Sequence, residues 1–371
     1  MRIGVNIRSA ANRGGIGRYT RRLLGALAAL DDRNEYRLYQ PAKYDYTKPP
    51  GWDKAEIINV SGPVNRAIWE NWNLPNALKK HKPDVFFCPD YTLPLMMNYP
   101  GVITVHDLTF MRHPVGLSRR AKMLYGKLFP PSAKKAKLIL ADSEHTRKDI
   151  IDLGLKDEKH VRTVHLGVDE SFFNDINDEA LRDTLSRYGL SPGYILFVGA
   201  IEERKNLRRL MEAYKLLKEK GNDIPQLILA GPKLDKADEI LASATGVSGI
   251  RHLGYVDDSH LHALYQGATG FIYPSLYEGF GLPPLEAMAA GAPVAVSRLT
   301  SLPEVVGDCG IYIDEPGSVE SIADAITKLI GLGDKRDEMI RVARERARGF
   351  TWRKCAELTL QALTDANGMK E

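Results

Sequence analysis

Strand-like and helix-like segments alternate along most of this 371-residue chain, and that alternation limits its fold more than any other feature. In the first half, the apolar runs RIGVNI at 2–7, DVFFC at 84–88, GVITVHD at 101–107 and LILAD at 138–142 are expected strands, and residues 19–30 carry leucine and alanine at the spacing of a helix. Parallel strands need crossover connections, which are usually helices. The order therefore predicts a parallel sheet with helices on both faces.

A second series with the same layout fills the other half of the chain. The expected strands are YILFVGA at 194–200, QLILAG at 226–231, RHLGYV at 251–256, GFIYPS at 270–275 and PVAVS at 293–297, and a helix is expected over about 206–220. The polar, turn-rich segment 167–192 separates the two series and predicts the domain junction. We expect an α/β protein of two doubly wound, Rossmann-like domains facing a central cleft, where ligands bind at the carboxyl ends of the strands.

Composition narrows the class of protein. The hydrophobic fraction of 44% and the charged fraction of 26% are typical of soluble globular proteins. No uninterrupted apolar stretch of about 18 residues and no signal-type apolar core occur, which predicts a cytoplasmic protein. Cys88, Cys309 and Cys355 are isolated, so we expect small buried side chains, with no disulfide framework or zinc site.

The net charge of +4 comes from a basic first half and an acidic second half. A basic first half fits an anionic partner, such as a diphosphate-linked acceptor or a phospholipid surface. No nucleic acid partner is expected.

Two carboxylates, Glu278 and Glu286, bracket a loop of glycines and prolines in YEGFGLPPLEAMAAG at 277–291. The apolar run before it should be a buried strand that ends near Ser275. Proline is favoured in the first turn of a helix, so the LPP segment should open a helix that Gly291 ends. The first glutamate then lies in the loop and the second in the early helix.

The loop between these carboxylates is suited to an anion. Gly279 and Gly281 allow close backbone approach, and the N–H groups and dipole of the helix point to the same place. Glu278 and Glu286, as hydrogen-bond acceptors, suit hydroxyl groups on either side. A nucleotide sugar has this order of hydroxyls, diphosphate and hydroxyls. The alternative is that both acids only stabilise the positive helix end.

Three further motifs follow predicted strands. Arg204 and Lys205 lie in a polar loop where they could clamp a diphosphate, although such a pair is more often solvated surface. No Asp-x-Asp pair is evident, so we expect no metal requirement. The glycines at 14–17 lack the third glycine of a dinucleotide fingerprint, which disfavours NAD and suggests a mobile loop. His106 ends a strand, where a structural role is the more common one.

Together these motifs resemble the retaining glycosyltransferases of family 4, which have the two-domain GT-B fold. The resemblance covers most of the chain and rests on the following segments: GGIGRY at 14–19, VHDLTF at 105–110, ADSEHTRKDI at 141–150, VHLGVD at 164–169, VGAIEERKNL at 198–207, LAGP at 229–232, LGYVDDSHL at 253–261 and PSLYEGFGLPPLEAMAAGAPVAVS at 274–297.

The resemblance implies a role for each part of the site. Glu286 would hold the ribose hydroxyls and Glu278 the donor hexose, with Arg204 and Lys205 stabilising the leaving group and His106 beside the hexose. Of these five residues, the ones implied to be catalytic are His106, Arg204, Lys205 and Glu278. The implied donor-binding residues are Gly15, Tyr255, Val256, Glu278, Gly279, Phe280, Gly281, Leu282 and Glu286.

Domain roles follow from the same resemblance. Residues 1–170 would bind the acceptor, with a C-terminal helix at about 351–371 packing back on them. Residues 190–348 would bind the nucleotide sugar.

NWNLP at 71–75 and HDLTFMRHP at 106–114 resemble bacterial mannosyltransferases of surface polysaccharide synthesis. The expected function is therefore metal-independent transfer of mannose from GDP-mannose, without a cofactor, to a glycan or lipid-linked saccharide. A UDP-sugar-dependent enzyme of the same family and a catalytically silent nucleotide-sugar-binding protein are the alternatives.

Residues 108–141 contain no acidic side chain and carry interleaved basic and apolar residues. This segment could dock peripherally on the anionic inner face of a membrane, or it could be an ordinary solvated helix with a core-facing stripe. Its residues are Arg119, Arg120, Lys122, Leu124, Tyr125, Lys127, Phe129, Lys134, Lys135, Lys137 and Leu138.

Overall fold

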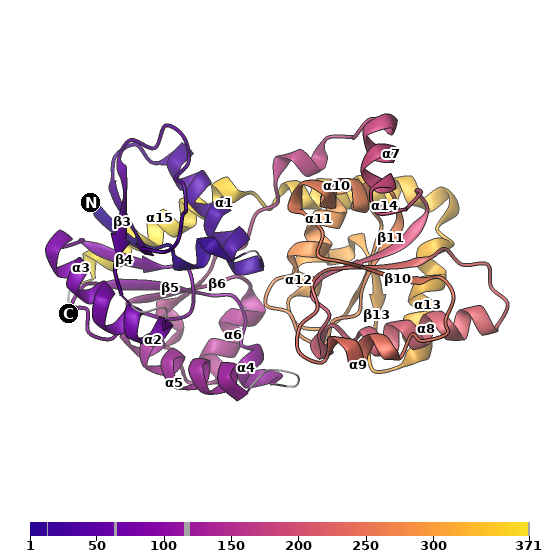
Figure 1. Cartoon of the computed structure of the whole chain (residues 1–371), viewed down its shortest axis with the longest axis horizontal. Helices are drawn as coiled ribbons and strands as arrows, with labels where there is room; N and C mark the ends of the chain where they lie inside the picture. The colour runs from indigo at the N-terminus through magenta and orange to yellow at the C-terminus, as the bar shows by residue number, and fades with distance from the viewer. Residues whose placement is uncertain (13, 63–64, 115–118, 370–371) are drawn as a thin grey trace. The chain divides into compact units, whose positions relative to one another are not determined.

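The computed structural model of the chain describes all residues except 13, 63–64, 115–118 and 370–371, and it leaves the side chains of 119–124 undescribed. Two compact units divide the chain (Figure 1). Unit 1 consists of Met1–Met111, Arg120–Gly167 and Thr351–Glu371, and unit 2 of Arg112–Arg119 and Val168–Phe350.

Unit 1 contains a parallel sheet in the order β3-β2-β1-β4-β5-β6-β7. Two helices cover one face of the sheet, and other helices cover the second face, where a large apolar core lies. The strands are β1 (Arg2–Asn6), β2 (Glu35–Pro41), β3 (Ala55–Val60), β4 (Val85–Cys88), β5 (Gly101–Val105), β6 (Leu138–Ala141) and β7 (Val161–Thr163).

The helices of unit 1 include a π-helical segment, η2 (Trp69–Asn73), between two short α-helices. α1 and α15 pack together and cover one sheet face, whereas α3, α5 and α6 cover the other. The bounds are η1 (Arg8–Ala11), α1 (Gly15–Leu30), α2 (Arg66–Ile68), α3 (Leu74–His81), α4 (Thr109–Arg112), α5 (Arg119–Lys135), α6 (Glu144–Asp152), η3 (Glu158–His160) and α15 (Trp352–Gly368).

Unit 2 contains a second parallel sheet in the order β10-β9-β8-β11-β12-β13. Its strands are β8 (Tyr194–Val198), β9 (Leu227–Ala230), β10 (Ile250–Gly254), β11 (Ala268–Tyr273), β12 (Val294–Ser297) and β13 (Ile311–Ile313). Its helices are η4 (Glu170–Phe173), α7 (Asp178–Ser186), η5 (Glu203–Lys205), α8 (Leu207–Glu219), α9 (Ala237–Ala242), α10 (Asp258–Gln266), α11 (Leu282–Ala290), α12 (Leu302–Val306), η6 (Gly307–Cys309), α13 (Val319–Ile330), η7 (Gly333–Lys335) and α14 (Arg336–Arg348).

The two parallel, doubly wound sheets confirm the predicted fold class, and α8 and α11 lie where the sequence predicts them. The predicted strands did not include β2, β3, β7 or β13. Three of these four are edge strands, which lack a neighbour on one side and have less continuous apolar runs. The three cysteines are free and buried, as expected.

The first helix differs from the prediction. It begins at Gly15 instead of near Tyr19, so the predicted mobile glycine loop is largely the first turn of α1. Gly17 is required there, because a Cβ on it would lie 1.9 Å from the carbonyl oxygen of Asn12.

The last helix, α15, completes unit 1. Its Trp352 ring packs 6.2 Å from the ring of Tyr19 on α1, and Asp365 forms a 2.6 Å ion pair with Arg162. Cys355 and Leu363 face the core of the unit, fully or almost fully buried. The last helix therefore supplies part of the core against β4, β5 and β6.

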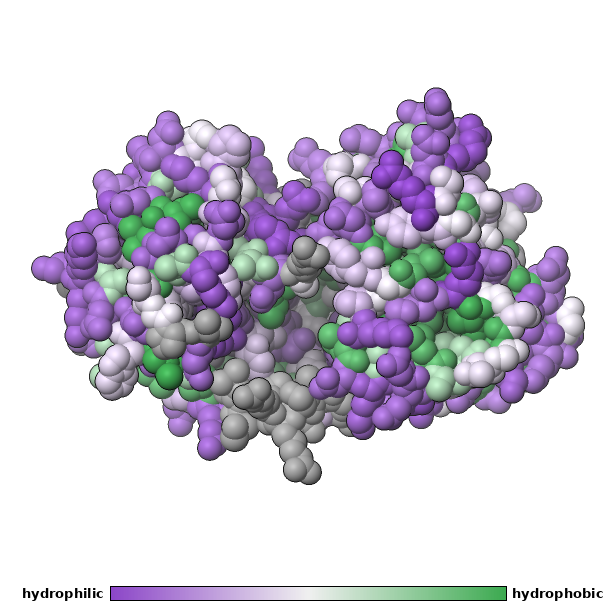
Figure 2. All heavy atoms as spheres, viewed as in Figure 1, coloured by the Kyte–Doolittle hydropathy of each residue, from purple (hydrophilic) through white to green (hydrophobic). Residues whose placement is uncertain are grey.

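On the face drawn in Figure 2, hydrophilic residues predominate and hydrophobic residues form small, scattered groups. Among the residues that the structure describes, no helix combines the length and the hydropathy needed to cross a membrane. Among the side chains that the structure describes, the large hydrophobic ones that are exposed are Ile68, Trp72, Met96, Leu234, Tyr255 and Leu358.

Candidate active site

The loop between β11 and α11 is held by hydroxyl groups. Ser275 Oγ donates to Oε1 of Glu278 at 2.6 Å, and the Glu278 N–H donates to Thr300 Oγ1 at 3.0 Å. Ser301 Oγ lies 3.0 Å from the carbonyl oxygen of Glu278 and 2.8 Å from that of Phe280. These contacts fix the backbone that leads into the helix.

The mouth of α11 has the geometry expected from its sequence. Gly281 caps the helix with φ at 111°, a conformation that only glycine adopts readily, and proline follows in the first turn. A Cβ on Gly281 would also lie 2.8 Å from Leu302 Cδ2. Gly291, with φ at 84°, ends the helix as predicted.

Glu278 is the centre of a buried charge cluster. Lys205 Nζ lies 2.6 Å from its Oε1, and Arg204 Nη1 lies 3.0 Å from its Oε2. Burial alone would raise the pKa of Glu278, but the charges of Arg204 and Lys205 lower it to about 2. Glu278 is therefore ionised at neutral pH and can only accept hydrogen bonds.

Strand order explains why these three residues meet. Arg204 and Lys205 follow β8, Glu278 follows β11, and β8 pairs with β11 in the sheet. The carboxyl ends of adjacent parallel strands lie at the same edge, so loops that follow them converge.

Arg204 and Lys205 are themselves held in place. Arg204 Nε pairs with Glu202 at 2.9 Å, and its Nη1 donates to the Tyr277 carbonyl at 2.9 Å. Lys205 Nζ lies 2.6 Å from Tyr273 Oη, and burial together with the charge of Arg204 lowers the pKa of its ammonium. In this structure their partner is Glu278, whereas the sequence suggested a diphosphate.

Glu286 lies on α11 and is buried, with 3% of its surface exposed. Tyr265 Oη on α10 donates to its Oε2 at 3.0 Å. Of the other predicted donor-binding residues, Phe280 and Val256 are buried, and Tyr255 is exposed just before α10. All of these residues belong to unit 2.

His106 and Gly15 belong to unit 1. The Nδ1 atom of His106 lies 2.7 Å from Oδ2 of Asp142, and Nε2 lies 3.0 Å from the Pro89 carbonyl oxygen. Burial alone would lower the pKa of this histidine, but Asp142 and the carbonyl raise it to about 9. Both nitrogens therefore carry protons directed at protein acceptors, and neither offers a lone pair to a substrate.

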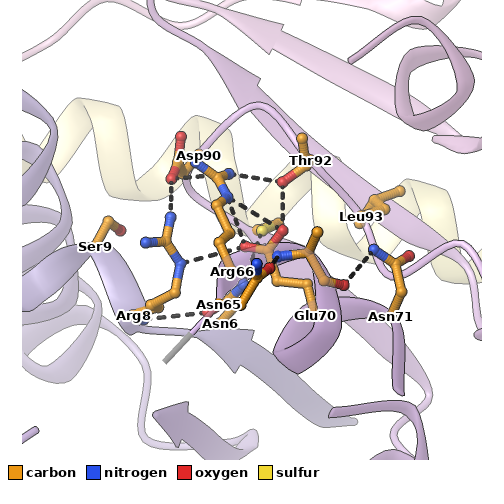
Figure 3. A network of polar contacts seen from close by, with 12 residues as sticks. Asn6, Arg8, Ser9, Asn65, Arg66, Glu70, Asn71, Asp90, Thr92 and Leu93 are labelled. Carbon is orange, nitrogen blue, oxygen red and sulfur yellow. Dashed lines mark hydrogen bonds and ion pairs between the residues drawn. The ribbon is translucent and has the colours of Figure 1, made fainter. Parts of the chain in front are cut away.

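Sequence reasoning missed the hydroxyls of Ser275, Thr300 and Ser301, which had no recognisable motif. It also missed a second charge cluster, which Figure 3 shows in unit 1. Charged residues just after two strands, Arg8 and Asp90, are the signal that could have found it. Within the described part of the chain, no group of three potential ligands is placed to hold a metal ion.

Comparison with known proteins decides the family. Residues 187–346 match the family of glycosyl transferases group 1, and residues 13–172 match glycosyltransferase family 4. The chain is 33% identical to O-antigen chain mannosyltransferase B of Escherichia coli over 375 aligned residues, which cover 94% of this chain and 95% of that protein. This chain belongs to the family 4 glycosyltransferases.

A second curated protein and a solved structure are also similar to this chain. The glycosyltransferase is 24% identical to O-antigen chain mannosyltransferase RfbU of Salmonella typhimurium, over 86% of this chain and 88% of that protein. Sucrose-phosphate synthase from Thermosynechococcus elongatus superposes with a TM-score of 0.79 over 98% of both chains, at 19% identity. The predicted GT-B fold and the predicted enzyme class are thus confirmed.

Proposed function

We propose that this glycosyltransferase transfers mannose from GDP-mannose to a glycan or lipid-linked saccharide, with retention of anomeric configuration and without a metal ion. The observation that carries the proposal is the 33% identity, over nearly the full length of both chains, to a mannosyltransferase of O-antigen synthesis. The second mannosyltransferase relative supports the same sugar.

The geometry of unit 2 supports specific roles in this reaction. Ionised Glu278 would accept hydrogen bonds from hexose hydroxyls, and Glu286 would accept them from ribose hydroxyls. Arg204 and Lys205, held rigidly beside Glu278, would stabilise the negative charge that develops on the departing diphosphate. Preorganised cations of this kind do not need to reorient during bond cleavage.

The proposed reaction uses no side chain in the described part of unit 2 as a general base. We propose a front-face reaction, in which the bond between the anomeric carbon and the diphosphate breaks while the acceptor oxygen bonds that carbon from the same face. The proton of the acceptor hydroxyl passes to the departing phosphate oxygen, so the products are the glycosylated acceptor and GDP.

The proposal is tested by acceptor-dependent release of GDP from GDP-mannose, with UDP-glucose as the competing donor. Proton NMR of the product reports the anomeric configuration, and EDTA tests the metal requirement. Transfer from UDP-glucose alone would contradict the donor assignment. Tight binding of GDP-mannose without any product would favour a sugar-nucleotide sensor instead.

A thermal-shift comparison of GDP with UDP tests the donor independently of any acceptor. GDP is expected to stabilise the protein and UDP to stabilise it less. In Glu286→Ala the shift by GDP should be smaller, because the ribose loses its carboxylate partner. Stabilisation by UDP and none by GDP would overturn the choice of mannose donor.

We also propose that the basic segment at 108–141 makes a peripheral contact with anionic lipid. Phe129 and Leu138 are fully buried, so they are unavailable to a membrane, whereas Lys127 and Lys134 are exposed. Residues 115–118 and the side chains of 119–124 lie outside the described residues. Co-sedimentation with vesicles that contain or lack phosphatidylglycerol tests this membrane contact. Equal and negligible binding to both kinds of vesicle would contradict it.

A further inference from the structure

The sheet of unit 1 has a topological switch point between β1 and β4. β2 and β3 lie on one side of this pair, and β5, β6 and β7 lie on the other. In open parallel sheets, ligands bind in the crevice outside the carboxyl ends of the strands at such a point. Here Arg8 follows β1 and Asp90 follows β4, each two residues beyond the end of its strand.

These two residues join a cluster of four charges (Figure 3). Arg8 Nη2 lies 2.8 Å from Oδ2 of Asp90, and Arg66 Nη2 lies 3.1 Å from the same atom. Arg8 and Arg66 also pair with Glu70 at 3.3 and 3.1 Å. Thr92 Oγ1 lies 2.8 Å from Oε2 of Glu70. Both oxygens of Glu70 are therefore engaged within the cluster.

The other oxygen of Asp90 differs from the rest. Oδ1 is buried and has no hydrogen-bond partner, in a side chain whose residue is only 5% exposed. In Figure 3 the dashed contacts of Asp90 run to its other oxygen. A buried acceptor without a donor is costly, and such atoms in proteins usually meet a ligand or a water molecule.

The charges around Oδ1 select the kind of donor it can accept. Burial raises the pKa of Asp90, but Arg66, Arg8 and His106 together lower it below its ordinary value, so the carboxyl is ionised. Two guanidinium groups balance two carboxylates. A cation at this position would be repelled by the guanidinium groups of Arg8 and Arg66, and an anion would be repelled by the negatively charged Oδ1. A neutral hydroxyl group avoids both repulsions and can donate a hydrogen bond to Oδ1.

We propose that Asp90 Oδ1 accepts a hydrogen bond from one hydroxyl of the acceptor saccharide, which makes Asp90 an acceptor-binding residue that selects the hydroxyl pattern. The inference rests on the proposed function and deepens it, because it places the acceptor sugar at the switch point of unit 1. Arg8, Arg66 and Glu70 act as the scaffold that holds the oxygen in position.

The test compares Asp90→Asn with Glu70→Gln. Each removes one negative charge from the same cluster, but only Asp90 has an oxygen left over for a ligand. GDP-mannose is the donor, and the acceptor is whichever methyl α-glycoside of mannose, glucose, galactose or N-acetylglucosamine the wild type uses fastest. A set of monodeoxy analogues of that glycoside, one for each free hydroxyl, identifies the hydroxyl.

In Asp90→Asn the KM for the acceptor should rise about 10- to 100-fold while the KM for GDP-mannose changes less than about twofold, because a hydrogen bond to a charged group is lost. In the wild type one deoxy analogue should lose a similar factor in kcat/KM, and in Asp90→Asn that penalty should disappear. Glu70→Gln should keep the deoxy penalty, even if its melting temperature falls by as much as that of Asp90→Asn. If Asp90→Asn does not fold, Asp90→Glu keeps the charge for Arg8 and Arg66, displaces the oxygen and carries the same comparison.

The outcomes separate the inference from the function. An unchanged acceptor KM and an unchanged deoxy pattern in Asp90→Asn, in an enzyme whose wild type transfers mannose, overturn the inference alone and leave Oδ1 to water. A wild type that binds GDP but uses none of the four glycosides also overturns it, because a carboxylate held for one sugar hydroxyl should recognise a single sugar. A wild type that neither binds GDP nor transfers overturns the proposed function, and the inference falls with it.

Discussion

At the scale of single residues, Glu278 is bound through both of its oxygens to positive groups. Lys205 contacts one oxygen and Arg204 the other. A carboxylate neutralised in this way is a poor nucleophile, and its ionised oxygens are better suited to orient hydroxyls. Removing one partner leaves a buried charge less well compensated, so each residue is expected to contribute to the stability of the fold in addition to its proposed role in the reaction.

Replacing Lys205 with methionine tests the proposed role in departure of the leaving group. We expect kcat to fall by about 10²- to 10³-fold, since one preorganised cation is removed. The control is Lys328→Met, which removes an ion pair to Asp324 with the same 2.6 Å separation but on an exposed helix. Steady-state kinetics of both variants decide, and a kcat for Lys205→Met equal to that of the control would contradict the role.

The pair of His106 and Asp142 predicts a pH dependence of stability. The pKa of His106 is raised from 6.5 to about 9 in the folded protein, so the protonated histidine contributes its full stabilisation at about pH 6.5 and below, as long as Asp142 is ionised. That contribution, at most about 3 kcal/mol, should be lost as the pH rises from 6.5 through 9. Burial raises the pKa of Asp142, and protonation of this carboxyl weakens the pair in acid.

Urea unfolding at pH 6, 7.5 and 9 measures this loss. In His106→Gln the dependence should be weaker by the contribution of the histidine, whereas groups common to both proteins cancel in the difference. Parallel stability curves for the two proteins would show that His106 does not titrate as proposed.

Residue types in the site were predictable, but their pairing was not. The motifs around positions 204 and 278 identified Arg204, Lys205 and Glu278, because each follows an apolar strand. Their mutual contact depends on the order of strands in the sheet, which the sequence does not show. The i,i+4 pair of Arg66 and Glu70 is typical of exposed helices, so nothing in the sequence indicated that Glu70 is 1% exposed.

At the scale of elements, α11 could be predicted almost to the residue, because prolines and glycines mark both of its ends. The start of α1 could not, because its first turn contains Gly15 and Gly17, which are weak helix formers. Glycine is required at position 17 despite its weak helix propensity, because the backbone of Asn12 leaves no space for a side chain. Close contacts of this kind appear only in three dimensions.

Gly281→Ala tests the mouth of α11. Alanine is strained at a φ of 111°, and its Cβ would lie 2.8 Å from Leu302, so we expect a loss of about 1–3 kcal/mol and weaker GDP binding. Gly25→Ala lies in the middle of α1, where the new Cβ would meet no atom within 4 Å apart from the adjacent residues and backbone of its own helix, so it should instead be neutral or stabilise by up to about 1 kcal/mol.

Unfolding by denaturant and titration with GDP compare the two variants. Equal stabilities of Gly281→Ala and the wild type would mean that the backbone at this helix mouth relaxes freely, contrary to the hydroxyl contacts that fix the loop.

At the scale of the whole molecule, α15 makes unit 1 discontinuous in sequence. Leu363 is fully buried, whereas Leu358, on the same helix, is 40% exposed. Leu363→Ala should destabilise unit 1 by about 2–5 kcal/mol and Leu358→Ala by much less, because only the first leaves a cavity.

Hydrogen exchange read peptide by peptide locates the effect. Protection should fall in β4, β5 and α1 for Leu363→Ala and stay unchanged in β8 and β11. Equal losses in both units would contradict their independence as compact bodies.

The membership of α15 in unit 1 also sets an order of events during synthesis. Every residue of unit 2 leaves the ribosome before the first residue of α15 does, although unit 2 comes second along the chain. The N-terminal part of unit 1 cannot complete its packing until translation has passed position 351, and the surface around Tyr19, which Trp352 contacts in the folded protein, stays uncovered until then. Newly made unit 2 can thus mature first, and the nascent earlier half is the part that a chaperone would need to protect.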